Sequence, residues 1–158
     1  MTSSAPPTAP APRRSAIDAF SERIRRSRAL DRRVQVWTPV LLTLFAGILR
    51  FANLGTPSSL VFDETYYVKD AWSQWLLGYT ANWPEGADAL FAQDDVPAPL
   101  VTGSFSVHPP LGKWLIGLGM WLFGSGDSVG WRVAVAAAGT LTVLIVYFIA
   151  RTLTGSTA

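Results

Sequence analysis

Two long uncharged stretches, separated by a polar segment rich in aromatic residues, dominate the hydrophobic pattern of this 158-residue sequence. The first begins at Val34 and, with Arg50 extending its aliphatic stem towards the membrane interface, continues to Leu54. Residues 34–54 are long enough to cross a bilayer core of about 30 Å as a helix. A cleaved signal peptide would end in a small-x-small cleavage site; no such site follows here, and the basic region before the stretch is long. We therefore expect an uncleaved first transmembrane helix.

The second long stretch predicts another transmembrane helix, over residues 131–151. Its central residues, 133–150, are uncharged and lie between two arginines. Their alanine, glycine and threonine content is typical of helices that pack closely in a membrane bundle. A third uncharged stretch, 114–126, has only thirteen residues. That length predicts an interfacial or re-entrant helix over about 111–123 rather than a crossing.

The segment between the two spans is expected to contain amphipathic helices. Apolar residues recur at near-helical spacing between Tyr67 and Gly78, which predicts a helix over about 65–79. Two later stretches, 80–88 and 93–104, are rich in Pro, Gly and Asp and are expected to be loop. The expected fold class is therefore all-α: a polytopic membrane protein fragment in which two transmembrane helices flank a long external loop with interfacial helices.

Composition excludes several classes of function. The formal net charge of +2 hides a strong polarity, because residues 1–33 carry a net charge of +5 and residues 51–131 carry −6. A nucleic-acid module would spread its basic residues over a folded face, whereas most of these lie in a tail, so we expect no nucleic-acid partner. The absence of cysteine excludes a disulfide framework, a thiolate metal site and a cysteine nucleophile.

The same polarity predicts how the chain is oriented in a membrane. The tail, residues 1–33, is proline-rich and expected to be disordered over 1–12, and it is basic thereafter. The positive-inside rule places this tail in the cytoplasm and residues 55–130 outside. The second span then returns the chain to the cytoplasm, before a truncated end at 152–158. We therefore expect a multi-pass protein of the plasma membrane, in contact with lipid.

Three short motifs contain residue types that suit catalysis or phosphate binding. They are Asp63-Glu64 after the first span, the run His-Pro-Pro-Leu-Gly-Lys from His108 to Lys113, and Arg132 at the second span. Each alone has a structural explanation: Asp63 as a helix N-cap, the prolines as a helix start, and a boundary cation as a membrane anchor. No cluster in the sequence has metal-ligand spacing, so no metal is expected.

Taken together, the motifs resemble the start of the protein O-mannosyltransferase family of bacterial type, within the glycosyltransferase C superfamily of polytopic membrane enzymes. The resemblance covers about residues 37–151 and includes Leu54-Gly55 and the Ala-Gly-Thr-Leu-Thr-Val run after Arg132. It implies inverting transfer of mannose from polyprenyl-phosphate-mannose to Ser or Thr hydroxyls of secretory proteins, with transfer during translocation as one option. The lipid-linked sugar is a substrate, and no cofactor is implied. Because family members are far longer, the chain resembles an N-terminal fragment that is inactive alone.

The residue types fit that reaction. A Ser or Thr hydroxyl is a poor nucleophile near neutral pH, so a positioned carboxylate must accept its proton. We expect Asp63 to be this base and Glu64 to orient it or the acceptor, and the reverse assignment stays open. Arg132 is the first candidate for the donor phosphate, because a guanidinium matches phosphate oxygens and the position resembles a functionally important arginine of the family. His108 and Lys113 are weaker candidates for the same role.

Other interpretations stay open. Another polyprenyl-phosphate-sugar transferase, acting on a lipid or a cell-wall glycan, could share an early acidic motif, although the His-Pro-Pro-Leu-Gly-Lys run favours the protein-modifying enzyme. A non-enzymatic two-span scaffold, whose acidic loop binds a partner, is the alternative outside enzymes. Arg50 and Lys69 also stay open as further phosphate contacts.

Overall fold

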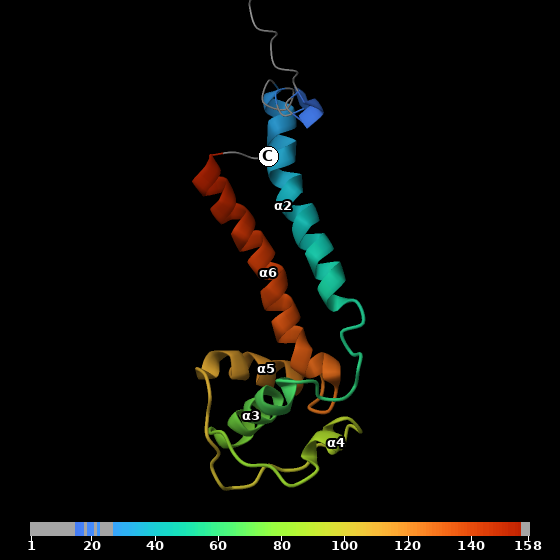
Figure 1. Ribbon diagram of the computed structural model, residues 1–158, viewed down its shortest axis with the longest axis vertical. Coiled ribbons are helices and arrows are strands. Elements are labelled where there is room, and N and C mark those ends of the chain that lie inside the picture. Colours follow the sequence, from blue (N-terminus) through green and yellow to red (C-terminus); the bar gives the residue numbers. More distant parts are fainter. Residues whose placement is uncertain (1–14, 18, 21, 23–26, 156–158) are drawn as a thin grey trace, which may run out of the picture.

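The structure is a computed structural model in which a pair of long helices carries three short helices at one end (Figure 1). The residues that it describes are 15–17, 19–20, 22 and 27–155. Within this part of the chain there is no strand, only an isolated bridge between Ala81 and Gly103. The prediction of an all-α chain with two membrane-spanning helices is confirmed for these residues. The expected disorder of residues 1–12 lies outside them.

The long helices are α2 (Arg28–Phe51) and α6 (Ser128–Thr154). Both are long and apolar enough to cross a membrane, and only 11% and 6% of their apolar windows are buried, unlike the core helix of a soluble protein. Each starts at an N-cap residue whose side chain accepts a first-turn N–H, Ser27 for α2 and Asp127 for α6. Both helices begin before the first residue that hydropathy predicts. α6 ends at Thr154, and Gly155, which caps it, adopts the left-handed conformation.

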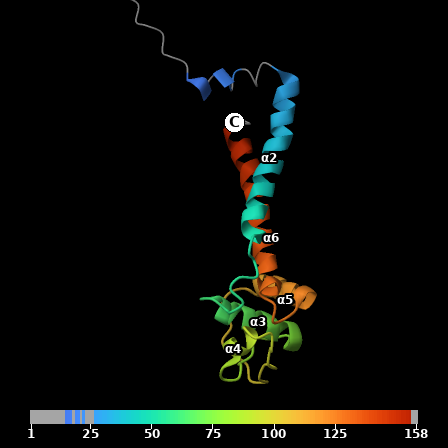
Figure 2. The ribbon, with the colours of Figure 1, turned by 90° about the vertical axis from the view of Figure 1, so that its right-hand side faces the viewer.

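α2 and α6 run antiparallel and pack against each other (Figures 1 and 2). At the end far from the short helices, Nη2 of Arg151 donates to Oε1 of Gln35 at 2.9 Å. Towards the other end, Arg50 lies against Gly139, and its Nη1 donates to the carbonyl of Ala46 at 3.2 Å. The stem of Arg50 therefore runs back along α2 and not towards the interface as expected. Helical side chains incline towards their own N-terminus, and Gly139 leaves room for this one.

The short helices are α3 (Glu64–Leu77), α4 (Ala87–Phe91) and α5 (Pro110–Phe123). α5 lies across the start of α6, and α3 packs against α5 on the side away from the long helices (Figure 1). With fourteen residues, α5 is shorter than a membrane crossing needs. The core between these helices consists of Val68, Ala71, Phe91, Met120 and Trp131.

Two details of this region differ from the sequence pattern. α4 begins inside the stretch 80–88 that was expected to be loop, because Gly86 adopts the left-handed conformation and Phe91 anchors the short helix in the core. α5 also approaches α6 very closely, since a Cβ atom at Gly119 would overlap the carbonyl oxygen of Gly130. The close contact between the helices thus requires glycine at position 119. In the sequence, this residue is recognisable only as one member of an uncharged stretch.

Candidate active site

Residues 52–63, which join α2 to α3, are held in place by Arg132 in the first turns of α6. The guanidinium donates through Nε to Oε1 of Glu64 at 2.7 Å and through Nη2 to Oε2 at 2.8 Å. It also donates to three backbone carbonyl oxygens of the connecting segment, those of Leu54 (3.1 Å), Pro57 (2.7 Å) and Ser59 (3.2 Å). All five N–H groups of the guanidinium therefore have an acceptor within the chain.

Glu64 is fully engaged by these contacts. Its Oε2 accepts a further hydrogen bond from the backbone N–H of Val61 at 3.0 Å. Burial alone would raise the pKa of Glu64, but the hydrogen bonds from Arg132 and Val61 and the positive charge of Arg132 outweigh it and lower the pKa below its ordinary value. Glu64 is therefore ionised at neutral pH, and its carboxylate serves to fix the start of α3.

Asp63 has the opposite environment, although it is the adjacent residue. It occupies the N-cap position of α3, but its backbone is αR and its side chain caps no N–H. Within the described part of the chain, its carboxylate is exposed and has neither a hydrogen-bond nor an ion-pair partner. The N-cap explanation for an acid at this position is therefore not supported. A carboxylate without a partner is available to bind a ligand or accept a proton.

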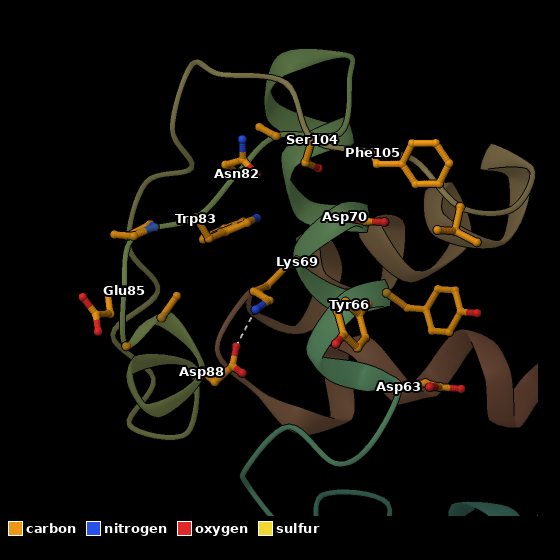
Figure 3. Close-up of a pocket in the computed structure, with 16 residues that line it drawn as sticks. Asp63, Tyr66, Lys69, Asp70, Asn82, Trp83, Glu85, Asp88, Ser104 and Phe105 are labelled. Atoms are coloured by element: carbon orange, nitrogen blue, oxygen red, sulfur yellow. Dashed lines mark ion pairs between the residues drawn. The ribbon is translucent and has the colours of Figure 1, made fainter.

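Two cavities meet at Asp63. The larger, which we call the outer cavity, has a volume of about 700 Å³ and lies between α3, α4 and residues 104–107 (Figure 3). The smaller, which we call the inner cavity, has a volume of about 290 Å³ and lies beside the starts of α3 and α6. Asp63 and Tyr67 line both cavities, because residues four apart share a face of α3. A molecule in either cavity would contact this shared wall.

His108 lies next to the same wall. Its ring centroid is 5.7 Å from that of Tyr67, with an angle of 39° between the rings. The residue is exposed, and its φ of 69° is in the left-handed region, which a non-glycine residue adopts at a cost. The turn at His108 thus brings the imidazole towards Tyr67 just before α5 begins.

Lys113 is buried against α3, next to Asp70. Its side chain is 2% exposed, and Nζ lies 2.8 Å from Oδ2 of Asp70 and 3.2 Å from Oγ of Ser106. The ammonium therefore ties α5 to α3 and to the segment that precedes His108. A buried ammonium is stable only with such partners, because desolvation penalises an unpaired charge.

Comparison with known proteins identifies the same family that the sequence motifs resemble. A family profile described as dolichyl-phosphate-mannose-protein mannosyltransferase matches residues 107–158, which include α5 and α6. The chain is 37% identical over 134 residues to a polyprenol-phosphate-mannose-protein mannosyltransferase of Corynebacterium glutamicum, a match over 79% of this chain and 22% of the relative. The chain belongs to the protein mannosyltransferase family.

Other members of the protein mannosyltransferase family give the same result. The chain is 36% identical over 129 residues to the enzyme of that name from Mycolicibacterium smegmatis, covering 79% of this chain and 22% of the relative. It is 35% identical over 120 residues to that of Mycobacterium tuberculosis, covering 74% and 20%. The chain therefore spans about a fifth of the length of the curated relatives that it matches. No solved structure matches it.

The structure brings four of the five predicted site residues to one region. Glu64 and Arg132 are paired, Asp63 is the residue before Glu64, and His108 contacts Tyr67. Lys113 is buried further along α3, where it is paired with Asp70. The predicted phosphate roles are not tested by these positions and stay predictions. Binding of phosphate by Arg132 or Lys113 would require that either residue exchange a present partner.

Tyr67 is the residue that the sequence analysis did not place in the site. The sequence did contain a signal for it, because Tyr67 follows Asp63 by one helical turn.

Among the described residues, no group of three or more histidines and carboxylates is arranged to hold a metal ion.

Proposed function

We propose that this chain provides part of the active site of a membrane enzyme that transfers mannose from polyprenyl-phosphate-mannose to Ser or Thr hydroxyls of secreted proteins. The observation that carries the proposal is the carboxylate of Asp63, which has no partner among the described residues and lies where the outer and inner cavities meet. The printed names of the relatives, which specify a polyprenol-phosphate-mannose donor and a protein acceptor, support the choice of substrates.

The two cavities suit substrates that come from opposite sides. The inner cavity is lined in part by apolar residues of α5 and α6, Ile116 and Val135, next to the long helices. We assign it to the sugar and phosphate of the donor, whose lipid chain must stay in the membrane. The outer cavity lies at the end away from the long helices and is assigned to the acceptor protein (Figures 1 and 3).

The reaction that we propose is a single displacement with inversion. The acceptor hydroxyl oxygen attacks the anomeric carbon of mannose and forms the new glycosidic bond. The bond between that carbon and the phosphate oxygen breaks, and polyprenyl phosphate leaves with the bonding electrons. The hydroxyl proton passes to the carboxylate of Asp63 and from there to solvent. Glu64 acts by holding the start of α3, so that Asp63 stays between the two cavities.

The leaving phosphate needs positive charge. His108 is the predicted phosphate ligand with an exposed side chain, and its ring lies next to that of Tyr67, which lines the inner cavity. Arg132 also lines that cavity and would reach the phosphate by exchanging a carbonyl acceptor such as that of Ser59. For Lys113 we propose a positioning role, through Ser106, on the segment that carries His108.

The proposed location is the plasma membrane, with the N-terminal end of α2 in the cytoplasm and the short helices outside. Arg32 and Arg33 near the start of α2 and Arg151 near the end of α6 support this orientation, because cytoplasmic flanks of membrane helices are enriched in arginine and lysine. Acceptors on the outer side are then secreted or surface-exposed proteins, and they are reached during or after translocation.

The deciding experiment is the Asp63→Asn substitution in the complete protein, assayed in membranes with labelled donor and a Thr-containing peptide. We expect transfer to fall by at least about a hundredfold, because the amide cannot accept the hydroxyl proton. Asp95→Asn is the matched control, since Asp95 is an exposed acid of the same region that lines neither cavity. Near-normal turnover by Asp63→Asn would contradict the role of base. Activity of the unmodified enzyme on a glycan or lipid acceptor, but not on peptides, would favour the other transferases.

A further inference from the structure

We propose that the outer cavity selects acceptor peptides by charge, so that basic or uncharged residues beside the acceptor Ser or Thr are preferred over acidic ones. This inference rests on the proposed function and adds to it a class of acceptor. It depends on two features of the outer cavity, which are an excess of negative charge and exposed aromatic surfaces.

The charges on the cavity wall do not cancel. Four carboxylates and one ammonium line it: Asp63, Asp70, Glu85, Asp88 and Lys69. Nζ of Lys69 lies 2.7 Å from Oδ1 of Asp88, and Asp70 is paired with the buried Lys113. Asp63 and Glu85 have no ion-pair partner among the described residues. The wall therefore presents two uncompensated negative charges, which attract cationic side chains and repel carboxylates.

The two uncompensated carboxylates, Asp63 and Glu85, lie far enough apart to have different roles in the proposal: one accepts the proton, and the other affects which peptides are preferred. In Figure 3, Asp63 and Glu85 lie at opposite sides of the outer cavity, with Tyr66, Lys69 and Trp83 between them. If the acceptor hydroxyl is at Asp63, then Glu85 meets a different residue of the peptide. The charge preference should therefore concern neighbouring positions and not the acceptor residue itself.

Aromatic side chains give the cavity an apolar surface for a peptide. Tyr66 and Phe105 are 70% and 88% exposed, and both line the cavity together with the part-buried Trp83. Nε1 of Trp83 is buried without a hydrogen-bond partner in the described part of the chain. Exposed rings beside uncompensated carboxylates suit an uncharged or cationic peptide, since a cation also binds favourably over an aromatic face.

Substitutions of Lys69 and Glu85 change the net charge of the outer cavity in opposite directions. The ammonium of Lys69 neutralises Asp88, so replacement by glutamine adds a third uncompensated carboxylate to the wall. Replacement of Glu85 by glutamine removes one of the two that exist. Glu85 is exposed and outside the helices, so this substitution changes the charge with little effect on packing. The two variants should therefore change the charge preference in opposite directions.

The experiment uses the complete protein in membranes and peptides that share one acceptor Thr but carry Lys, Gln or Glu at each nearby position in turn. The measurement is the ratio of kcat/KM for the Lys peptide to that for the Glu peptide. We expect a ratio of about ten for the unmodified enzyme at the most sensitive position, as two nearby charges in a water-exposed site would give. Glu85→Gln should lower the ratio about threefold, Lys69→Gln should raise it about threefold, and Asp95→Asn should leave it unchanged.

The outcomes separate this inference from the proposed function. Transfer with a ratio near one at every position, or equal ratios in all three variants, overturns the charge selection and leaves the transferase proposal standing. The ratio should also fall towards one at high ionic strength, because exposed charges are screened. If the unmodified enzyme transfers mannose to no peptide, while lipid or glycan acceptors react, both proposals fail together.

Discussion

The guanidinium of Arg132 and the carboxylate of Glu64 form a two-point ion pair, with Nε to Oε1 at 2.7 Å and Nη2 to Oε2 at 2.8 Å. The pair joins the start of α6 to the start of α3. Because Asp63 immediately precedes Glu64, the position of the proposed base is linked to the membrane helix through this contact. The same guanidinium also donates to backbone carbonyls of residues 52–63, so one residue holds both the start of α3 and the segment that leads to it.

Replacing Arg132 by lysine should show how much the geometry of this pair matters. Lysine keeps the charge but cannot serve five acceptors in a plane, so we expect a loss of about 2 kcal/mol in stability and reduced mannosyl transfer. The measurement is thermal unfolding in detergent, followed by circular dichroism. A double-mutant cycle with Arg132→Ala and Glu64→Gln should give a coupling energy of about 1 kcal/mol or more. Effects that simply add would contradict the pairing.

The ion pair also predicts how stability depends on acid. The pKa of Glu64 lies below its ordinary value in the folded protein, so its contribution to stability is complete above the unfolded pKa, near 4.5, and is lost as the pH falls through the folded pKa. We expect the unmodified protein to lose thermal stability as the pH falls below the unfolded pKa of 4.5. Glu64→Gln should lose less over the same range. Identical slopes for the two proteins would exclude this residue as the cause.

The buried pair of Lys113 and Asp70 should behave differently from an exposed one. Lys113→Met leaves the carboxylate of Asp70 unpaired at a site that is 17% exposed, which should cost about 3 kcal/mol. Lys113→Met combined with Asp70→Leu should recover most of the loss, because no unpaired charge remains. Lys69→Gln is the comparison, since the Asp88 partner is 47% exposed and the expected cost is below about 1 kcal/mol. Unfolding temperatures would measure all three, and equal costs for both pairs would contradict the burial argument.

Two glycines of α5 give a matched test of helix packing. A Cβ atom at Gly119 would overlap the carbonyl oxygen of Gly130 and lie 2.8 Å from Cγ1 of Val133, whereas a Cβ atom at Gly112 meets nothing within 4 Å. Gly119→Ala should therefore destabilise the protein by about 1 to 3 kcal/mol through overpacking. Gly112→Ala should stabilise it by about 0.5 to 1 kcal/mol, because alanine favours a helix. Thermal unfolding decides between them, and a stable Gly119→Ala variant would mean that α5 and α6 are less close.

Much of the fold follows from hydropathy alone. Long uncharged stretches must avoid water, so α2 and α6 are located by composition, and a fourteen-residue α5 is too short to cross. The helix starts are less predictable from this signal, because they depend on the N-cap contacts of Ser27 and Asp127 and not on hydrophobicity. The direction of Arg50 was likewise wrong in the sequence analysis, since it depends on space at Gly139 in the neighbouring helix.

The candidate site is only partly predictable from local sequence. The family, the membrane helices and the residue types from which a site could be built all follow from the sequence. The sequence favours Asp63 over Glu64 as the base but leaves the reverse assignment open, because adjacent helical residues diverge by about 100° and either could face a ligand. The packing of the helices, in contrast, pairs Glu64 with Arg132 and leaves Asp63 beside two cavities without a partner among the described residues. This pairing depends on how α3 packs against α5 and α5 against α6, which brings together residues 68 positions apart.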